Sequence, residues 1–227
     1  MPASGDDWGV GLNQLPRVIP LGSARPALAG PDHPMRRVTR EVAFEPNGWT
    51  PERAAKVAEL FDSLAPTWAE RDVPERHDAV RDALGRGGPF PAGVCLEVGA
   101  GIGSATPDLM NAFGSVVSTD LSTEMLARLP ATVPRVRADA SRLPVADRSV
   151  AVVALINMFV FPTEVDRALR HDGVVLWVST VGDATPIYLP AADVLQALPG
   201  EWNGVASSAG WGDWLVARRA PRSTSSG

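Results

Sequence analysis

The sequence predicts an α/β fold, in which a mostly parallel β-sheet carries helices on its faces. From Val94 onward, short apolar runs alternate with short helical segments. The first run, Val94–Val98, is followed by glycine at every second position, in Gly99, Gly101 and Gly103. Small or acidic residues then follow the predicted strands, which is where an open parallel sheet binds its ligands.

The stretch Val94–Ser104 reads V-C-L-E-V-G-A-G-I-G-S and predicts a buried strand that leads into a ligand-binding turn. Glycines have no Cβ atom, so the chain can turn sharply and a ligand can approach the backbone. The helix after the turn would present its N–H groups to an anionic part of that ligand. The turn by itself therefore predicts a small ligand that carries a carboxylate or a phosphate.

Composition excludes several classes of protein. The chain has 227 residues, 45% of them hydrophobic, which suits a globular domain with a sizeable core. Its longest apolar run, Val150–Ile156, is far shorter than the roughly 18 residues that a membrane helix needs. A net charge of −5 argues against nucleic acid as a partner. The single cysteine, Cys95, excludes a disulfide framework, and no signal-peptide pattern is present, so we expect a cytoplasmic protein.

Residues 1–48 are rich in proline and glycine and have no sustained period, so we expect an irregular arm that either lies on the domain or is mobile. Residues 49–88 predict a helical cap. Thr50 and Pro51 begin an amphipathic segment with the pattern of an N-cap followed by proline at the first helical position. A second cap helix is expected at about Glu75–Leu84.

Residues 89–220 form the predicted α/β domain, and residues 221–227 a disordered tail. The last two strands are expected to form a hairpin. The predicted strands are Val94–Val98, Ser115–Thr119, Arg135–Ala138, Val150–Ile156, Val174–Thr180, Trp202–Ser207 and Trp211–Arg218. The predicted helices are Ala105–Phe113, Thr123–Leu129, Thr163–Arg170 and Ala191–Leu198.

Three polar residues, Asp120, Asp139 and Asn157, follow the second, third and fourth predicted strands. Asp120 lies 21 residues after Gly99, a separation at which an acid reaches the hydroxyls of a ribose. Asp139 lies one sheet position further out, where it could accept the amino group of an adenine. The pattern therefore predicts an adenosine compound. A dinucleotide site usually has the pattern G-x-G-x-x-G, in which the last position is glycine or alanine. Here Ser104 holds that position, which disfavours a dinucleotide.

Five segments in register form a recognisable set, which is Glu97–Gly103, Ser118–Leu126, Ala138–Val153, Arg167–Gly173 and, before the sheet, Phe61–Trp68. Together they resemble the class I S-adenosylmethionine-dependent methyltransferases, in particular the group (methyltransferase-11) that includes the ubiquinone and menaquinone C-methyltransferases. The resemblance implies a Rossmann-like, doubly wound sheet of seven strands in the order 3-2-1-4-5-7-6, with the last strand antiparallel and an N-terminal helical cap. It also implies S-adenosylmethionine as cofactor, S-adenosylhomocysteine as product and methyl transfer by in-line displacement.

The resemblance also implies cofactor-binding roles for ten residues, which are Glu97, Gly99, Ala100, Gly101, Gly103, Asp120, Leu121, Asp139, Ala140 and Asn157. The glycine turn would approach the methionine part, and Glu97 would hold its amino group. Asp120 would bind the ribose hydroxyls, and Leu121 would pack on the adenine face. Asp139 and the Ala140 N–H would form hydrogen bonds with the edge of the adenine ring. Asn157 would lie beneath the methionine part.

No catalytic residue is assigned from the sequence. His77 and Tyr188 are candidates for a base or a substrate contact, and Arg71 for a partner of the cofactor carboxylate. The segment between the fourth and fifth strands is short, so the acceptor is expected only to be a small organic molecule. We expect a monomer or homodimer, with no metal, nucleic acid or membrane insertion. There are two alternatives. The first is a non-catalytic protein of the same fold that binds the cofactor or a partner protein, and the second is an NAD-dependent oxidoreductase.

Overall fold

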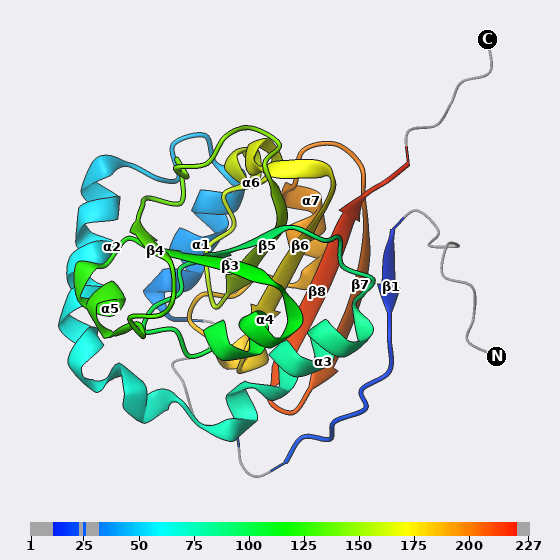
Figure 1. Ribbon diagram of the computed structural model, residues 1–227, viewed down its shortest axis with the longest axis horizontal. Helices are drawn as coiled ribbons and strands as arrows, with labels where there is room; N and C mark the ends of the chain where they lie inside the picture. The colour runs from blue at the N-terminus through cyan, green and yellow to red at the C-terminus, as the bar shows by residue number, and fades with distance from the viewer. Residues whose placement is uncertain (1–10, 23–24, 26–31, 222–227) are drawn as a thin grey trace.

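An eight-stranded sheet forms the centre of the protein, with helices on both faces (Figure 1). The computed structural model describes residues 11–22, 25 and 32–221. The strands are β1 (Leu12–Gln14), β2 (Val94–Val98), β3 (Ser115–Asp120), β4 (Arg135–Arg137), β5 (Val150–Ile156), β6 (Leu169–Ser179), β7 (Trp202–Ala209) and β8 (Gly212–Arg219). The helices are α1 (Pro34–Phe44), α2 (Pro51–Leu64), α3 (Asp78–Arg86), α4 (Thr106–Ala112), α5 (Thr123–Arg128), α6 (Pro162–Ala168) and α7 (Ala191–Ala197), with 3-10 helices η1 (Ala65–Arg71), η2 (Pro74–Arg76) and η3 (Gly182–Ala184).

The strands lie in the order β1-β7-β8-β6-β5-β2-β3-β4. Strands β2 to β6 pair in parallel, whereas β8 runs antiparallel to both β6 and β7. The strands β2 to β8 therefore have the predicted order, and the antiparallel last strand is confirmed. No helix within the described residues is both long and apolar enough to cross a membrane.

Two elements in the N-terminal segment differ from the prediction. β1 pairs in parallel with β7, with Leu12 opposite Gly204, so the sheet has eight strands and not seven. α1 is a regular helix, begun by Pro34 and capped by His33, whose Nδ1 accepts the Met35 N–H at 3.1 Å. The prediction of an irregular arm over residues 1–48 is thus wrong for both elements. Residues 1–10, 23–24 and 26–31 and all but the first residue of the predicted tail lie outside the described part.

The central strands are buried on both faces, as expected for a parallel sheet covered by helices. Leu96 and Val98 of β2 belong to one apolar cluster, and Cys95 belongs to the cluster on the opposite face. Cys95 is 0% exposed, and burial raises the pKa of its thiol above the ordinary value. The cysteine is therefore a core residue and not an accessible nucleophile.

The cap is held over one edge of the sheet by a contact between α2 and α5. The Asp62 carboxylate accepts hydrogen bonds from the Ser122 hydroxyl and from the Glu124 N–H. Ser122 is also the N-cap of α5, as predicted, since its hydroxyl accepts the Met125 N–H at 3.0 Å. Because α5 begins directly after β3, this contact places α2 beside the carboxyl ends of the parallel strands.

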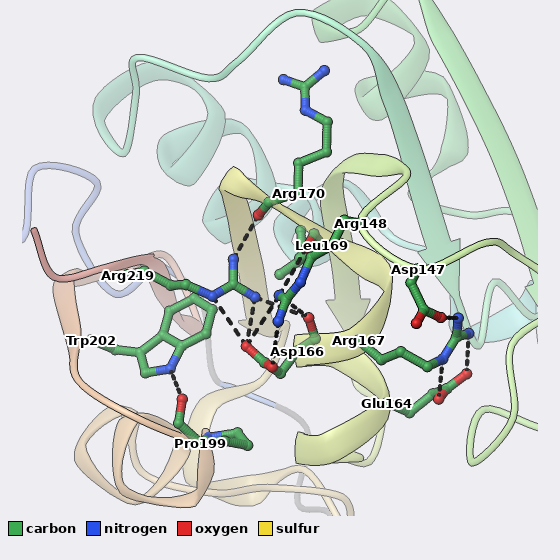
Figure 2. Close-up of polar contacts among 10 residues, drawn as sticks. All are labelled: Asp147, Arg148, Glu164, Asp166, Arg167, Leu169, Arg170, Pro199, Trp202 and Arg219. Carbon is green, nitrogen blue, oxygen red and sulfur yellow. Dashed lines mark hydrogen bonds and ion pairs between the residues drawn. The ribbon is translucent and has the colours of Figure 1, made fainter. Parts of the chain in front are cut away.

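A network of charged residues lies at the other end of the central strands, where β5 and β6 begin and β8 ends (Figure 2). The Asp166 carboxylate accepts hydrogen bonds from Arg219 at 2.6 Å and from Arg148 at 3.1 Å. The two guanidinium groups also donate to main-chain carbonyls, including those of Leu169 and Arg170. Burial raises the pKa of Asp166, but the bonds to the two arginines outweigh it and hold the pKa below the usual range. The network ties the end of β8 to α6.

We expect Asp166→Asn to lower the free energy of unfolding by about 1–2 kcal/mol at neutral pH, because it removes the charge that two arginines share. A depressed native pKa contributes stability that is present above the unfolded pKa and lost as pH falls through the native value. The difference between wild type and variant should therefore shrink in acid, which urea denaturation at several pH values measures. Asp172→Asn is the control, since the Asp172 side chain is 66% exposed in its pair with Arg170.

Candidate functional site

A cavity lies at the carboxyl ends of the parallel strands β2 to β6, beneath the cap. It contains about 1220 Å³ of space between atoms, including the part that opens to solvent. Eight of the ten predicted cofactor-binding residues line it, which are Glu97, Gly99, Ala100, Gly101, Asp120, Leu121, Ala140 and Asn157. Gly103 and Asp139 are not among its lining residues. The structure thus brings together residues from four separate strand ends.

The glycine turn adopts backbone angles that favour glycine, with φ of +73° at Gly99, +59° at Gly101 and +89° at Gly103. The Gly101 position faces the cavity, where a Cβ atom would have only the Trp68 Nε1 and the Met125 sulfur near 4 Å. A Cβ atom at Gly103 would instead lie 3.0 Å from Leu129 Cδ1. Gly101 therefore leaves room for a ligand, whereas Gly103 leaves room for protein packing.

Asp120 closes the turn from the end of β3. Its Oδ2 accepts the Gly101 N–H and its Oδ1 accepts the Ser122 N–H, both at 2.8 Å. Burial raises the pKa of Asp120, and the backbone donors partly oppose this rise. Because each carboxylate oxygen can accept more than one hydrogen bond, Asp120 can hold the turn and still accept from a ligand in the cavity.

Glu97 is a buried acid at the base of the cavity, with 2% of its surface exposed. The Thr106 and Ser118 hydroxyls both donate to its Oε2, at 2.6 and 2.7 Å. Burial raises the pKa of Glu97 to about 7, although the two hydroxyl donors oppose this rise. The side chain can therefore change its charge near neutral pH, and a bound cation would favour the ionised form.

Asp139 is turned toward the cap. Both of its oxygens lie 3.0 Å from the indole Nε1 of Trp49, which donates to them. Trp49 itself lines the cavity and packs against Phe159 and Phe161. In the part of the site predicted to bind adenine, Ala140 and Trp49 therefore line the cavity. Asp139 does not line it and instead holds the Trp49 indole.

Asn157 follows β5 with a positive φ of +51°, which is uncommon outside glycine. Its Oδ1 accepts the Thr180 N–H and its Nδ2 donates to the Thr180 hydroxyl, both at 2.9 Å. These bonds join the ends of β5 and β6. Asn157 thus shapes the cavity floor, and Thr180 is a lining residue that sequence reasoning missed.

The two candidate bases are both engaged elsewhere. His77 lines the cavity, but its Nδ1 lies 2.7 Å from Asp108 and its Nε2 lies 2.8 Å from Asp72. Burial lowers the pKa of His77, but the bonds to the two carboxylates outweigh it and raise the pKa above 6.5. Tyr188 does not line the cavity; its hydroxyl donates to Asp213, and burial raises its pKa. Neither side chain is a free base in the cavity.

Two arginines of the cap line the cavity. Arg71 lies over the Trp68 ring, with its guanidinium carbon 4.6 Å from the ring centroid. Arg76, at the end of η2, donates to the Thr180 hydroxyl at 3.3 Å. Sequence reasoning missed Arg76 because nothing in its local pattern distinguishes it from a surface arginine. Within the described residues, no group of His, Cys, Asp and Glu side chains could hold a metal ion.

The comparison with protein families identifies the central part of the chain. Residues 96–176, from β2 to β6, match the family model described as a methyltransferase domain. This part of the chain is a methyltransferase domain. It contains the glycine turn, Glu97, Asp120 and Asn157, and the cap lies before it in the sequence.

Known relatives of the methyltransferase domain differ in their acceptors. A malonyl-[acyl-carrier protein] O-methyltransferase of Dechloromonas aromatica is 30% identical over 151 residues, which are 63% of this chain and 57% of that protein. The chain thus spans little more than half the length of this curated relative. The DhpI–SAH complex shares the fold, with a TM-score of 0.61 and 21% identity over 74% of this chain and 98% of that one.

A third similar protein is phosphoethanolamine N-methyltransferase 1 of Haemonchus contortus, solved with phosphoethanolamine and S-adenosylhomocysteine. Its TM-score is 0.55, with 16% identity over 79% of this chain and 52% of that chain. The two solved structures confirm the Rossmann-like methyltransferase fold of the domain.

Proposed function

We propose that this protein transfers the methyl group of S-adenosylmethionine to a small organic acceptor and releases S-adenosylhomocysteine. The observation that carries the proposal is the meeting of Gly101, Asp120 and Glu97 in one cavity beneath the cap. Solved relatives of the same fold bind S-adenosylhomocysteine, which supports this choice of adenosine compound. The malonyl-[acyl-carrier protein] relative extends well beyond the matched part, so its acceptor is not transferred to this chain.

The proposed roles follow the order of the strands. Asp120, at the end of β3, accepts the ribose hydroxyls, and the Ala140 N–H meets the adenine edge. The backbone of the glycine turn meets the methionine part, and Glu97 accepts its amino group. Gly103 and Asp139 have supporting roles, since Gly103 packs against Leu129 and Asp139 holds Trp49 at the cavity.

When bound, the cofactor supplies a methyl group that is open to in-line displacement. The residues of the chain act mainly by position, because fixing two reactants in line contributes roughly 7–11 kcal/mol without an acid or a base. The cap shields the reacting groups from water, with Trp49, Phe61 and Trp68 along the cavity wall. A non-catalytic protein that binds the same cofactor would share these features but would not transfer the methyl group.

Transfer of labelled methyl separates these two functions. We expect label from S-adenosylmethionine to appear in a small-molecule metabolite extract when the protein is added. Protein that binds S-adenosylhomocysteine but transfers no label would contradict the enzymatic function and leave a binding function.

Replacement of Gly101 by alanine is expected to weaken S-adenosylhomocysteine binding about tenfold, because the methyl side chain would enter space that the ligand needs. The positive φ of Gly101 adds backbone strain in the same variant. Calorimetry measures the affinity, and circular dichroism checks the fold. Gly114→Ala is the control, since a Cβ atom there meets no atom within 4 Å. Equal affinity of both variants would show that the ligand does not approach this turn.

A further inference from the structure

Arg76 lies over the ends of β5 and β6, on one side of the cavity. Its guanidinium donates to the Thr180 hydroxyl, and Thr180 is bonded in turn to Asn157. β6 is separated from β2 by β5, and neighbouring strands lie roughly 4.8 Å apart. Arg76 therefore lies about 10 Å along the sheet from the glycine turn, on the side away from Asp120.

The Arg76 guanidinium has donors to spare. Among the described residues it forms no ion pair with a carboxylate, and its one hydrogen bond is to Thr180. The nearby Asp72 carboxylate is bonded to His77 at 2.8 Å. Burial and the neighbouring Arg71 lower the pKa of Arg76, and the attraction of Asp72 opposes this only in part. An arginine has five N–H donors, so most of them are free to bind an anion in the cavity.

Arg71 serves a different part of the cavity. It lies on the Trp68 ring, and the Trp68 Nε1 is 3.8 Å from the position of a Cβ atom at Gly101. Arg71 is therefore near the glycine turn and the proposed methionine part, whose carboxylate it can bind. This leaves Arg76 for a second anion, on the β6 side.

Neither His77 nor Tyr188 is free to act as a base at this side of the cavity. His77 has both ring nitrogens bonded to carboxylates, and Tyr188 lies outside the cavity lining. A nucleophile that must lose a proton would depend on an acid of the lining such as Asp72, which is bonded to His77. A carboxylate needs no base, since it is ionised at neutral pH.

We propose that the acceptor is a carboxylic acid, that Arg76 binds its carboxylate at the end of β6, and that the carboxylate oxygen receives the methyl group. This inference rests on the proposed function. A carboxylate oxygen forms a bond to the methyl carbon as the bond from that carbon to sulfur breaks. The electron pair of the broken bond stays on sulfur, no proton moves, and the product is a methyl ester.

The test uses S-adenosylmethionine labelled in its methyl group, a small-molecule metabolite extract and the full chain. Methyl esters release methanol in mild alkali, whereas N-methyl, C-methyl and ether products do not. We expect the transferred label to become volatile after alkali. Label that is transferred but stays non-volatile would overturn the carboxylate acceptor and leave methyl transfer intact. Absence of transfer would overturn the proposed function and this inference with it.

Arginine variants test the position of the anion. Arg76→Gln should lower ester formation about tenfold or more, with S-adenosylhomocysteine affinity within about threefold of wild type. Arg76→Lys, which keeps the charge but not the planar fork, should recover part of the ester formation. Arg71→Gln should weaken S-adenosylhomocysteine instead, and Arg142→Gln, at an exposed site outside the cavity lining, should change neither. Loss of S-adenosylhomocysteine affinity in Arg76→Gln would assign Arg76 to the cofactor and overturn the proposal.

Discussion

Replacement of Asp120 by alanine is expected to weaken S-adenosylmethionine binding by about 1–3 kcal/mol, the scale of lost hydrogen bonds to a charged group. Two effects act together in this variant. The ribose hydroxyls lose their acceptor, and the Gly101 N–H loses the Asp120 oxygen that lies 2.8 Å away and fixes the turn. Isothermal calorimetry with wild type and variant measures the difference.

Asp120→Asn distinguishes the two effects. The amide keeps one oxygen acceptor for the turn, so its binding should fall between those of wild type and Asp120→Ala. Urea denaturation shows whether each variant is folded. A folded Asp120→Ala protein that binds S-adenosylmethionine as tightly as wild type would show that the ribose assignment is wrong.

Replacement of Glu97 by glutamine is expected to change how stability depends on pH. Burial raises the native pKa of Glu97 to about 7, above the ordinary value of 4.5. A raised native pKa gives stability that is fully present below the unfolded pKa and is lost as pH rises through the native value. Ionisation of Glu97 should therefore cost on the order of 3 kcal/mol between acid and neutral pH, a cost that glutamine does not have.

The measurement is the free energy of unfolding in urea at several pH values between 4 and 8. This window spans the ordinary pKa of Glu97, 4.5, and its pKa in the folded protein, about 7. We expect the wild type to lose stability across this window relative to Glu97→Gln. The glutamine amide oxygen can accept from Thr106 and Ser118 as the carboxylate does, so the variant is a close structural match. A constant difference between the two proteins would mean that folding does not shift the pKa of Glu97 from its ordinary value.

The sequence contained enough local information for most of the sheet and for most of the cavity. Apolar runs and helix signals mark strands β2 to β8, and the glycine turn marks the strand edge at which a ligand binds. The residues that follow the strands need no distant partner to be recognised. Asp120 could therefore be assigned to the site before any contact was known, whereas the role of Glu97, within β2, came from the family resemblance.

The missed features depend on contacts between distant parts of the chain. β1 has three residues and no apolar alternation, and it forms a strand because β7 offers an open edge about 190 residues away. The hydrogen bond from Trp49 to Asp139, 90 residues later, was not expected from the sequence. Arg76 gains its position from Thr180, 104 residues later. No local pattern encodes such pairings, because the partners come together only in the folded chain.

Binding of the cofactor tests the central claim most directly. Calorimetry of the full chain against S-adenosylmethionine, S-adenosylhomocysteine and NAD compares the proposed ligands with the disfavoured dinucleotide. We expect one site per chain for the two sulfur compounds and no binding of NAD. Binding of NAD, with no heat from either sulfur compound, would contradict the account.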